Sequence, residues 1–200
     1  MKEGGIGYIK LIQFTERTPS KLDEALSELK AKGARALILD LRGNPGGPLE
    51  GAIEVASRFL ESGPVVHIKG RKHEETREVM TDCPKCPIGP MVVLVNEGTA
   101  SASEIVAAAL QDHKRAVIVG TPTFGKGTIQ TVVTLSDGSS LAVTSAKYLR
   151  PNGKPIDPDH PIRPDVEVRR TEEDEAKGRD PQLERAMQIL KERLREESAR

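Results

Sequence analysis

Residues 36–47 read Ala-Leu-Ile-Leu-Asp-Leu-Arg-Gly-Asn-Pro-Gly-Gly, and this stretch decides the fold class. Residues 36–41 are short and almost wholly apolar, which is typical of a strand buried on both faces of a parallel sheet. The glycines and proline that follow end the strand in a turn, and residues 48–61 then carry apolar side chains at helical spacing. Strand, turn and helix in this order are the first half of a βαβ unit.

The same alternation continues on both sides of this stretch. It predicts a strand at 6–14 and an amphipathic helix at 20–32 before it, and a strand at 65–69 after it. Apolar strands at 91–95 and 116–119 enclose an Ala-rich helix at 102–111, and strands at 128–135 and 140–148 flank the turn Ser136-Asp137-Gly138. The expected fold class is therefore α/β, with a parallel sheet, covering helices and an antiparallel hairpin.

The C-terminal part of the chain differs in composition. Proline recurs between residues 151 and 164, which indicates an extended wrap. Residues 171–200 are dense in charge, and a helix is predicted at 181–197, where Leu183, Met187, Leu190 and Leu194 form one narrow stripe. Two interpretations stay open, a docked helix and a frayed charged helix. We expect a core at 1–170 and a charged helical tail at 171–200.

Composition excludes several classes of partner. Lys and Arg number 30, as do Asp and Glu, so the formal net charge is zero and no basic surplus is present to bind nucleic acid or anionic lipid. The chain has no Trp, two Tyr and three Phe, which argues against base-stacking surfaces. No apolar run reaches the roughly 18 residues that a transmembrane helix needs, and no signal peptide is recognised at the start.

The turn at 40–47 has two interpretations. Glycine lets backbone N–H groups approach an anion closely, and the following helix N-terminus is electropositive, so the turn can form an oxyanion hole. It can equally be a simple change of chain direction.

Ser101 lies at a second junction of strand and helix, in Asn-Glu-Gly-Thr-Ala-Ser-Ala-Ser-Glu at 96–104. Ser101 with Glu104 fits a capping box, so one interpretation is a helix cap. In the other, Ser101 is a nucleophile, with the N–H after it and the helix dipole stabilising an oxyanion. The Gly-x-Ser-x-Gly elbow of α/β-hydrolases is absent.

Residues 120–127 almost match a phosphate-binding loop, with Gly120, Gly125 and Lys126 in place. Gly127 stands where that loop needs Ser or Thr, and a strand pattern follows where it needs a helix. Lys126 is either a solvated loop lysine or, if it is shielded from water beside Phe124, a neutral amine that acts as a base. On an extended strand Gln130 would lie on the same side and orient that amine.

Histidine and cysteine do not supply an alternative centre. The four histidines, at 67, 73, 113 and 160, are interpreted as structural or solvated, with His160 beside Asp159 the strongest exception. Cys83 and Cys86 form one C-x-x-C, which is half of a zinc site at most. A loop disulfide or a pair without function is the expectation, rather than a redox centre.

Several motifs in order resemble one family. Residues 97–104 followed by Thr-Phe-Gly-Lys-Gly at 123–127 closely resemble the carboxyl-terminal processing proteases, also called tail-specific proteases. The resemblance runs from about Gly7 to Val168 and includes the 40–47 turn, the strand at 144–148 and Pro-Asp-Val at 164–166.

The resemblance implies an α/β, crotonase-like core and hydrolysis of peptide bonds near substrate C-termini by a Ser-Lys dyad, with neither metal nor cofactor. Ser101 would be the nucleophile, Lys126 the general base and Gln130 the group that orients it. The oxyanion hole would be formed by the N–H groups of Ala102 and Gly47. The implied partners are proteins or peptides with exposed C-termini, and most relatives work outside the cytoplasm.

The chain also departs from the family pattern. Most members carry a PDZ domain before the core strand, whereas here that strand starts at Ile6, so this chain without a PDZ domain is either an excised core or a member that lacks the module. A peptide-binding core of the same fold without turnover is the alternative function. The C-x-x-C loop has no counterpart that we associate with the family.

Overall fold

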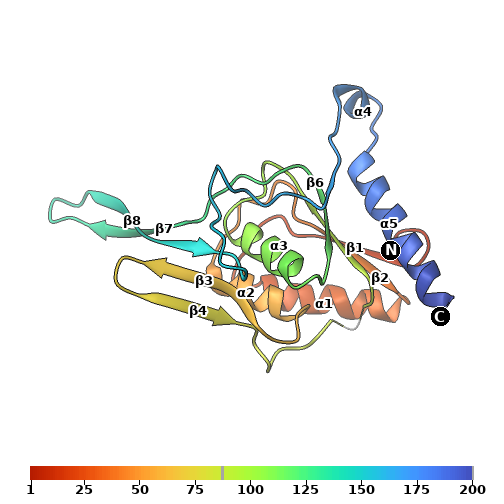
Figure 1. Ribbon diagram of the computed structural model, residues 1–200, viewed down its shortest axis with the longest axis horizontal. Helices are drawn as coiled ribbons and strands as arrows, with labels where there is room; N and C mark the ends of the chain where they lie inside the picture. The colour runs from red at the N-terminus through yellow and green to blue at the C-terminus, as the bar shows by residue number, and fades with distance from the viewer. Residues whose placement is uncertain (87, 200) are drawn as a thin grey trace.

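The protein is described by a computed structural model covering residues 1–86 and 88–199, and its centre is a five-stranded parallel sheet (Figure 1). The strand order is β1-β2-β5-β6-β9, with every neighbouring pair parallel. The strands are β1 (Ile6–Lys10), β2 (Ala36–Asp40), β5 (Met91–Val95), β6 (Val117–Gly120) and β9 (Val166–Glu167). The predicted α/β class with a parallel sheet is confirmed.

Helices cover both faces of this sheet. Side chains alternate along each strand, so Leu37 and Leu39 of β2 join one apolar cluster while Ala36 and Ile38 join another. The first cluster is shared with α1 (Thr18–Ala31), α2 (Leu49–Ser57) and α3 (Ala102–Asp112), and the second with α5 (Pro181–Ser198). Burial on both faces explains why the central strands are almost continuously apolar.

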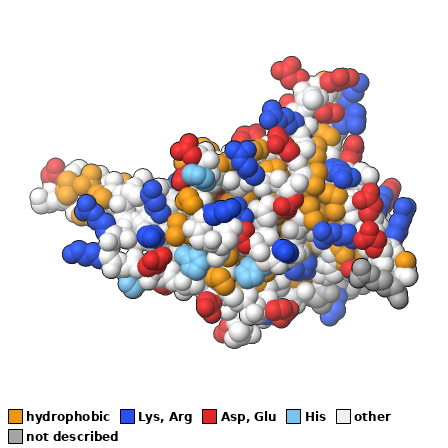
Figure 2. Space-filling view, in the orientation of Figure 1, with side chains coloured by type: hydrophobic (Ala, Val, Ile, Leu, Met, Phe, Trp, Pro, Cys, Tyr) orange, Lys and Arg blue, Asp and Glu red, His pale blue; other side chains and the backbone are white. Residues whose placement is uncertain are grey.

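A second sheet is antiparallel and extends away from the core (Figure 1). Its order is β4-β3-β8-β7, with strands β3 (Pro64–Gly70), β4 (Glu74–Glu78), β7 (Thr128–Thr134) and β8 (Ser140–Leu149). β7 and β8 form the predicted hairpin, and Figure 2 shows hydrophobic side chains gathered near its tip, on the left of that view. These exposed side chains are Val132, Val133, Leu135, Leu141 and Val143.

Of the two interpretations of the C-terminal helix, the structure supports the docked helix. Ala186, Ile189, Leu190 and Leu194 are buried against the parallel sheet, so α5 is a covering layer of the core rather than a frayed helix. The chain reaches α5 through the short helix α4 (Glu172–Ala176), which projects from the body at the top of Figure 1.

Some boundaries differ from prediction. β1 ends at Lys10, because the chain beyond it follows the turn after β2, where Phe14 N–H donates to the Gly46 carbonyl oxygen (2.9 Å). α2 ends at Ser57, whose hydroxyl bonds the Ile53 carbonyl oxygen and accepts the Met80 N–H. The two-residue β9 and the charged β4 and α4 were not predicted, because they lack an apolar periodicity.

Among the described residues, no helix has the length and apolar character required to cross a bilayer.

Candidate active site

Three loops meet at the carboxyl edge of the parallel sheet. They follow β2 (residues 41–48), β5 (96–101) and β6 (121–127), and parallel strands place their following loops at one edge. All the predicted site residues except Gln130 lie in these loops or at the start of α3. Hydrogen bonds between the loops therefore decide the geometry of the site.

Asn44 connects the first loop to the second. Its side chain is fully buried, donates to the Leu11 carbonyl oxygen (2.9 Å) and accepts the Gly46 N–H (2.9 Å). Its carbonyl oxygen accepts the Ala100 N–H (3.0 Å) and the Ser103 hydroxyl (3.1 Å). The glycine turn is thereby held directly against the segment that carries Ser101.

Thr99 connects all three loops. Its buried hydroxyl donates to the Leu41 carbonyl oxygen (2.9 Å) and accepts the Asn96 N–H (3.0 Å). Its carbonyl oxygen accepts the N–H of Phe124, in the lysine loop, at 3.0 Å.

Ser101 has a strained backbone. Its φ is 56° and its ψ is −119°, a conformation that costs a non-glycine residue about 1–3 kcal/mol. Of the predicted capping box, the hydrogen bond from the Ser101 N–H to Glu104 Oε2 (2.9 Å) is formed. Within the described part of the chain the Ser101 hydroxyl makes no capping hydrogen bond. A hydroxyl at the N-terminus of a helix, on a strained turn and not engaged as a cap, is well placed for attack on a carbonyl.

Glu104 joins the serine loop to the lysine loop. Its carboxylate is fully buried, and Oε2 accepts the N–H of Lys126 (2.8 Å) as well as that of Ser101. Oε1 accepts the Thr123 hydroxyl (2.5 Å) and the Gly125 N–H (2.8 Å). Because both N–H groups bond the same oxygen, the backbone nitrogens of Ser101 and Lys126 are close neighbours in the fold.

Sequence reasoning recognised Glu104 only as part of a cap and missed its connection to residues 123–126. A signal was present, since this carboxylate stands in a stretch of helix that is otherwise small or apolar, where a buried charge needs several donors.

The predicted shielding of Lys126 is wrong for this structure. Lys126 is exposed, and Phe124 beside it is 61% exposed. The reason is that successive residues of this loop face alternately inward and outward. Gly125 and Gly127 face inward and are buried against residues 156–158, where there is no room for a Cβ. The side chains at 124 and 126 consequently point to the open side.

Gln130 is also exposed, and its predicted alignment with Lys126 required one regular extended strand that runs through both residues. β7 begins only at Thr128, and the register shifts between Ile129 and Gln130. In the described ranges neither side chain hydrogen bonds to the other. The start of a strand at Thr128 does confirm that this is not a phosphate-binding loop, which would open a helix.

Two backbone N–H groups near Ser101 have no acceptor. In residues 1–86 and 88–199, the N–H groups of Gly47 and Ala102 make no hydrogen bond. The Gly46 N–H, by contrast, donates to the Asn44 side chain, and Pro45 carries no N–H. A Cβ at Gly46 would lie 2.8 Å from the Ala102 nitrogen, so the turn passes directly beside the start of α3. Backbone donors without an acceptor, in the turn beside Ser101 and at the start of α3, are the kind of group that an oxyanion hole uses.

The histidines take part in other contacts. His67 lies between the Thr76 hydroxyl (2.8 Å) and the Pro151 carbonyl oxygen (3.1 Å), and His113 bonds the Pro64 carbonyl oxygen (2.8 Å). His160 pairs with Asp157 (2.8 Å), and this hydrogen bond is the main cause that lowers the pKa of that carboxyl.

Cys83 and Cys86 are free thiols in this structure, without the loop disulfide that we considered. Burial raises the pKa of Cys86. Lys85 between them donates to the carbonyl oxygens of Ser57, Leu60 and Met80 (2.8–3.0 Å), which ties the loop to the end of α2. Across the described residues no group of three potential metal ligands occurs.

A polar cavity of about 660 Å³ lies beside the site, on the side of the sheet covered by α5. Gly43, Asn96 and Thr121, one from each loop, contribute to its wall, while Ser101 and Lys126 do not.

Comparison with known proteins identifies relatives. Residues 5–168 match Peptidase family S41. The chain is 43% identical over 191 residues to a carboxy-terminal-processing protease of Bartonella bacilliformis, covering 90% of this chain and 43% of that protein. It is 42% identical over 154 residues to the carboxy-terminal processing protease CtpA of Bacillus subtilis, covering 77% of this chain and 33% of that protein.

A solved structure agrees with these matches. The photosystem II D1 C-terminal processing protease superposes with a TM-score of 0.76 at 40% identity, over 84% of this chain and 44% of that one. The chain thus spans less than half the length of these relatives.

Proposed function

This chain belongs to Peptidase family S41, and from that premise we propose that it is a serine endopeptidase that cleaves protein substrates near their C-terminus with Ser101 and Lys126. The observation that carries the proposal is the position of the strained Ser101, beside two unused N–H groups and joined through Glu104 to the lysine loop. The C-terminal preference rests on the names of its relatives.

In the proposed reaction, the Ser101 hydroxyl oxygen attacks the carbonyl carbon of the scissile peptide, and its proton moves to the neutral amine of Lys126. The negative charge that develops on the carbonyl oxygen is stabilised by the N–H groups of Gly47 and Ala102. The C–N bond then breaks, and the Lys126 ammonium protonates the leaving amine. Water then attacks the resulting Ser101 ester while Lys126 accepts its proton. The ester C–O bond breaks, the Lys126 ammonium returns the proton to the Ser101 oxygen, and the new carboxylic acid leaves.

The exposure of Lys126 adds a requirement to this proposal. An amine in water remains mostly protonated at neutral pH, so the general base must be shielded when the substrate lies over the lysine loop. Phe124, which is exposed on the same side, is available to cover the bound segment. We assign to Gln130 the role of orienting the Lys126 amine once the site is covered.

The test uses a peptidyl diphenyl phosphonate, which forms a bond to activated serines, together with cleavage of unstructured proteins that have varied C-termini. We expect the label on Ser101, located by peptide mass spectrometry, and no cleavage by Ser101→Ala. Ser139→Ala, which removes an exposed hydroxyl in the hairpin turn, is the matched control and should cleave normally. Cleavage by Ser101→Ala within a few-fold of the parent would refute the assignment.

The alternative function is peptide binding without turnover, and the exposed Lys126 is the observation that favours it. Such a protein would bind peptides and fail to react with the phosphonate at every pH tested. Labelling of Ser101 excludes it.

A further inference from the structure

Arg42 connects the glycine turn to the C-terminal helix. It lies two residues after the end of β2, and its guanidinium donates to both carboxylate oxygens of Asp40 (2.9 and 2.7 Å). The same guanidinium donates to both carboxylate oxygens of Asp180 (2.8 Å each), 138 residues further along the chain. Gln182 accepts a further hydrogen bond (3.0 Å).

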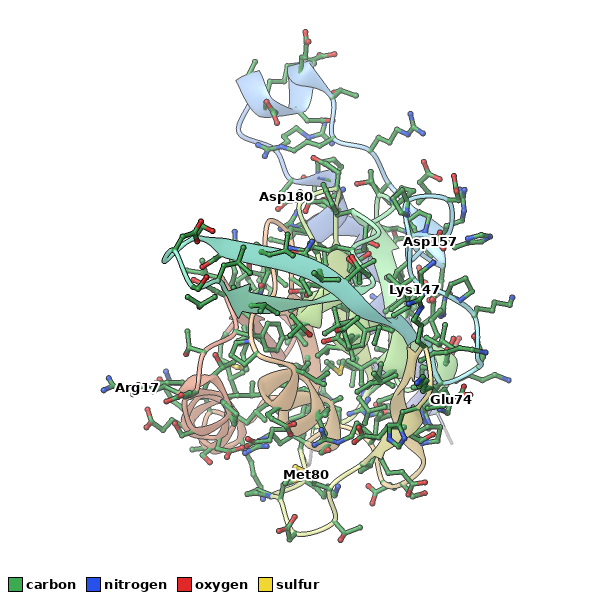
Figure 3. The ribbon with its side chains drawn as sticks, turned by 90° about the vertical axis from the view of Figure 1, so that its left-hand side faces the viewer. Arg17, Glu74, Met80, Lys147, Asp157 and Asp180 are labelled. Atoms are coloured by element: carbon green, nitrogen blue, oxygen red, sulfur yellow. The ribbon has the colours of Figure 1, made fainter. Side chains whose placement is uncertain are left out.

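Asp180 has two functions in this contact. As the N-cap of α5 it accepts the Leu183 N–H (3.0 Å), and its paired oxygens face the Arg42 guanidinium. Burial by itself would raise the pKa of Asp180, but the hydrogen bonds from Arg42 and Leu183 outweigh it and the pKa is lowered. Figure 3 shows Asp180 at the base of the projecting arm, where α5 begins.

On its other side Arg42 is continuous with the predicted oxyanion turn. Its backbone N–H donates to Asp40 Oδ1 (3.0 Å), and the next residue, Gly43, donates to the Asn96 side chain (2.8 Å). Asn44 then holds Ala100, as described above. The Arg42–Asp180 pair, the backbone of residues 42–44 and the Asn44–Ala100 hydrogen bond therefore connect the start of α5 to the residue before Ser101.

The sequence gives no indication of this connection. The match to the peptidase family ends at residue 168, and Asp180 lies beyond it. From sequence, Asp180 is only a helix cap in a charged tail.

We propose that Asp180 is a positioning residue, which fixes the glycine turn through Arg42 so that the Gly47 N–H faces the reacting carbonyl. This inference rests on the proposed function of the site. It assigns the C-terminal helix a part in catalysis in addition to its packing on the sheet.

The physical basis is the orientation of the guanidinium. Arg42 is 14% exposed and its guanidinium pairs with two carboxylates, which restricts its side chain and the direction of the backbone after β2. Without the Asp180 charge, Nη1 and Nη2 of Arg42 lose their bidentate partner, and the guanidinium is left with its weaker hold on the α5 side, the hydrogen bond to Gln182, and with its bonds to Asp40. Helix α5 itself stays docked, because its apolar contacts lie further along the helix.

Asp180→Asn in the whole protein tests the proposal. Asparagine caps a helix as well as aspartate does, so α5 keeps its cap while the charge pair with Arg42 is lost. The matched control is Glu184→Gln. It removes a carboxylate from the first turn of α5, and that carboxylate pairs with the exposed Arg179. Hydrogen–deuterium exchange of residues 41–47 is measured alongside kcat and KM.

For Asp180→Asn we expect faster exchange at 41–47 and a kcat lower by about 10- to 100-fold, the scale of a small misplacement of a catalytic group. The KM of Asp180→Asn should be unchanged. Glu184→Gln should match the parent in exchange rate at 41–47, in kcat and in KM. Unchanged exchange at 41–47 would overturn the proposal, as would faster exchange with normal kcat. A parent protein that neither cleaves nor reacts with the phosphonate refutes the proposed function instead, and exchange alone then decides whether Asp180 holds the turn.

Discussion

The buried carboxylate of Glu104 gives the sharpest test of how the site is assembled, through the substitution Glu104→Gln. Glutamine has nearly the same shape, but one of its two terminal groups is a donor. Its best placement keeps the oxygen at the position of Oε2, where it still accepts from Ser101 and Lys126. The NH₂ group then faces the Thr123 hydroxyl and the Gly125 N–H.

The cost follows from these contacts. Thr123 can accept from the NH₂ group, but the Gly125 N–H, which is itself a donor, loses its acceptor in a fully buried place. One orphaned buried N–H costs about 1–3 kcal/mol, and exchanging a charged for a neutral acceptor weakens the bonds to Ser101 and Lys126 by about 1 kcal/mol each. The total is about 3–5 kcal/mol, which is a large part of the stability of a typical domain.

Urea unfolding followed by circular dichroism measures this loss, and phosphonate labelling of Ser101 measures its effect on the site. Glu97→Gln is the matched control, because Glu97 lies in the loop that precedes α3, is exposed and accepts the Thr121 hydroxyl. We expect its stability to stay within about 0.5 kcal/mol of the parent. A Glu104→Gln protein within about 1 kcal/mol of the parent and labelled at the parental rate would refute the reasoning.

Three further predictions follow from other contacts. Gly47→Ala should destabilise the fold by at least about 2 kcal/mol more than Gly43→Ala. A Cβ at position 47 would lie 2.2 Å from the Phe14 carbonyl oxygen, whereas a Cβ at position 43 meets nothing within 4 Å. Equal losses of stability in urea unfolding would contradict this. Burial and a hydrogen bond to a buried carboxylate raise the pKa of Tyr8 to about 12, so the stability that its neutral form contributes is complete below pH 10 and is lost as the pH rises toward 12. Tyr8→Phe should remove that part of the loss of stability at alkaline pH. An unchanged loss of stability between pH 10 and 12 would count against this role of Tyr8. Lys126→Arg should abolish cleavage with an unchanged melting temperature, because the position is exposed and a guanidinium stays protonated; retained cleavage would show that a positive charge suffices.

Much of the fold was predictable because its signals are local. The buried strand at 36–40 and the Ala-rich helix α3 are visible in apolar pattern alone, and the glycines at 43, 46 and 47 indicate a turn that brings the backbone close to another segment. That the glycine turn lies beside Ser101 was expected from the resemblance to a known family rather than from these local patterns. The sequence by itself therefore determined the fold class.

The tertiary structure decided what depends on contacts between distant residues. Whether Lys126 is buried depends on residues 156–158, which pack on the glycines beside it and direct its side chain outward. The roles of Glu104 and Asp180 likewise depend on partners 22 and 138 residues away. Such partners leave no periodicity in the chain, because a buried charge is satisfied by whichever donors the packed fold brings to it, and only the folded arrangement shows which they are.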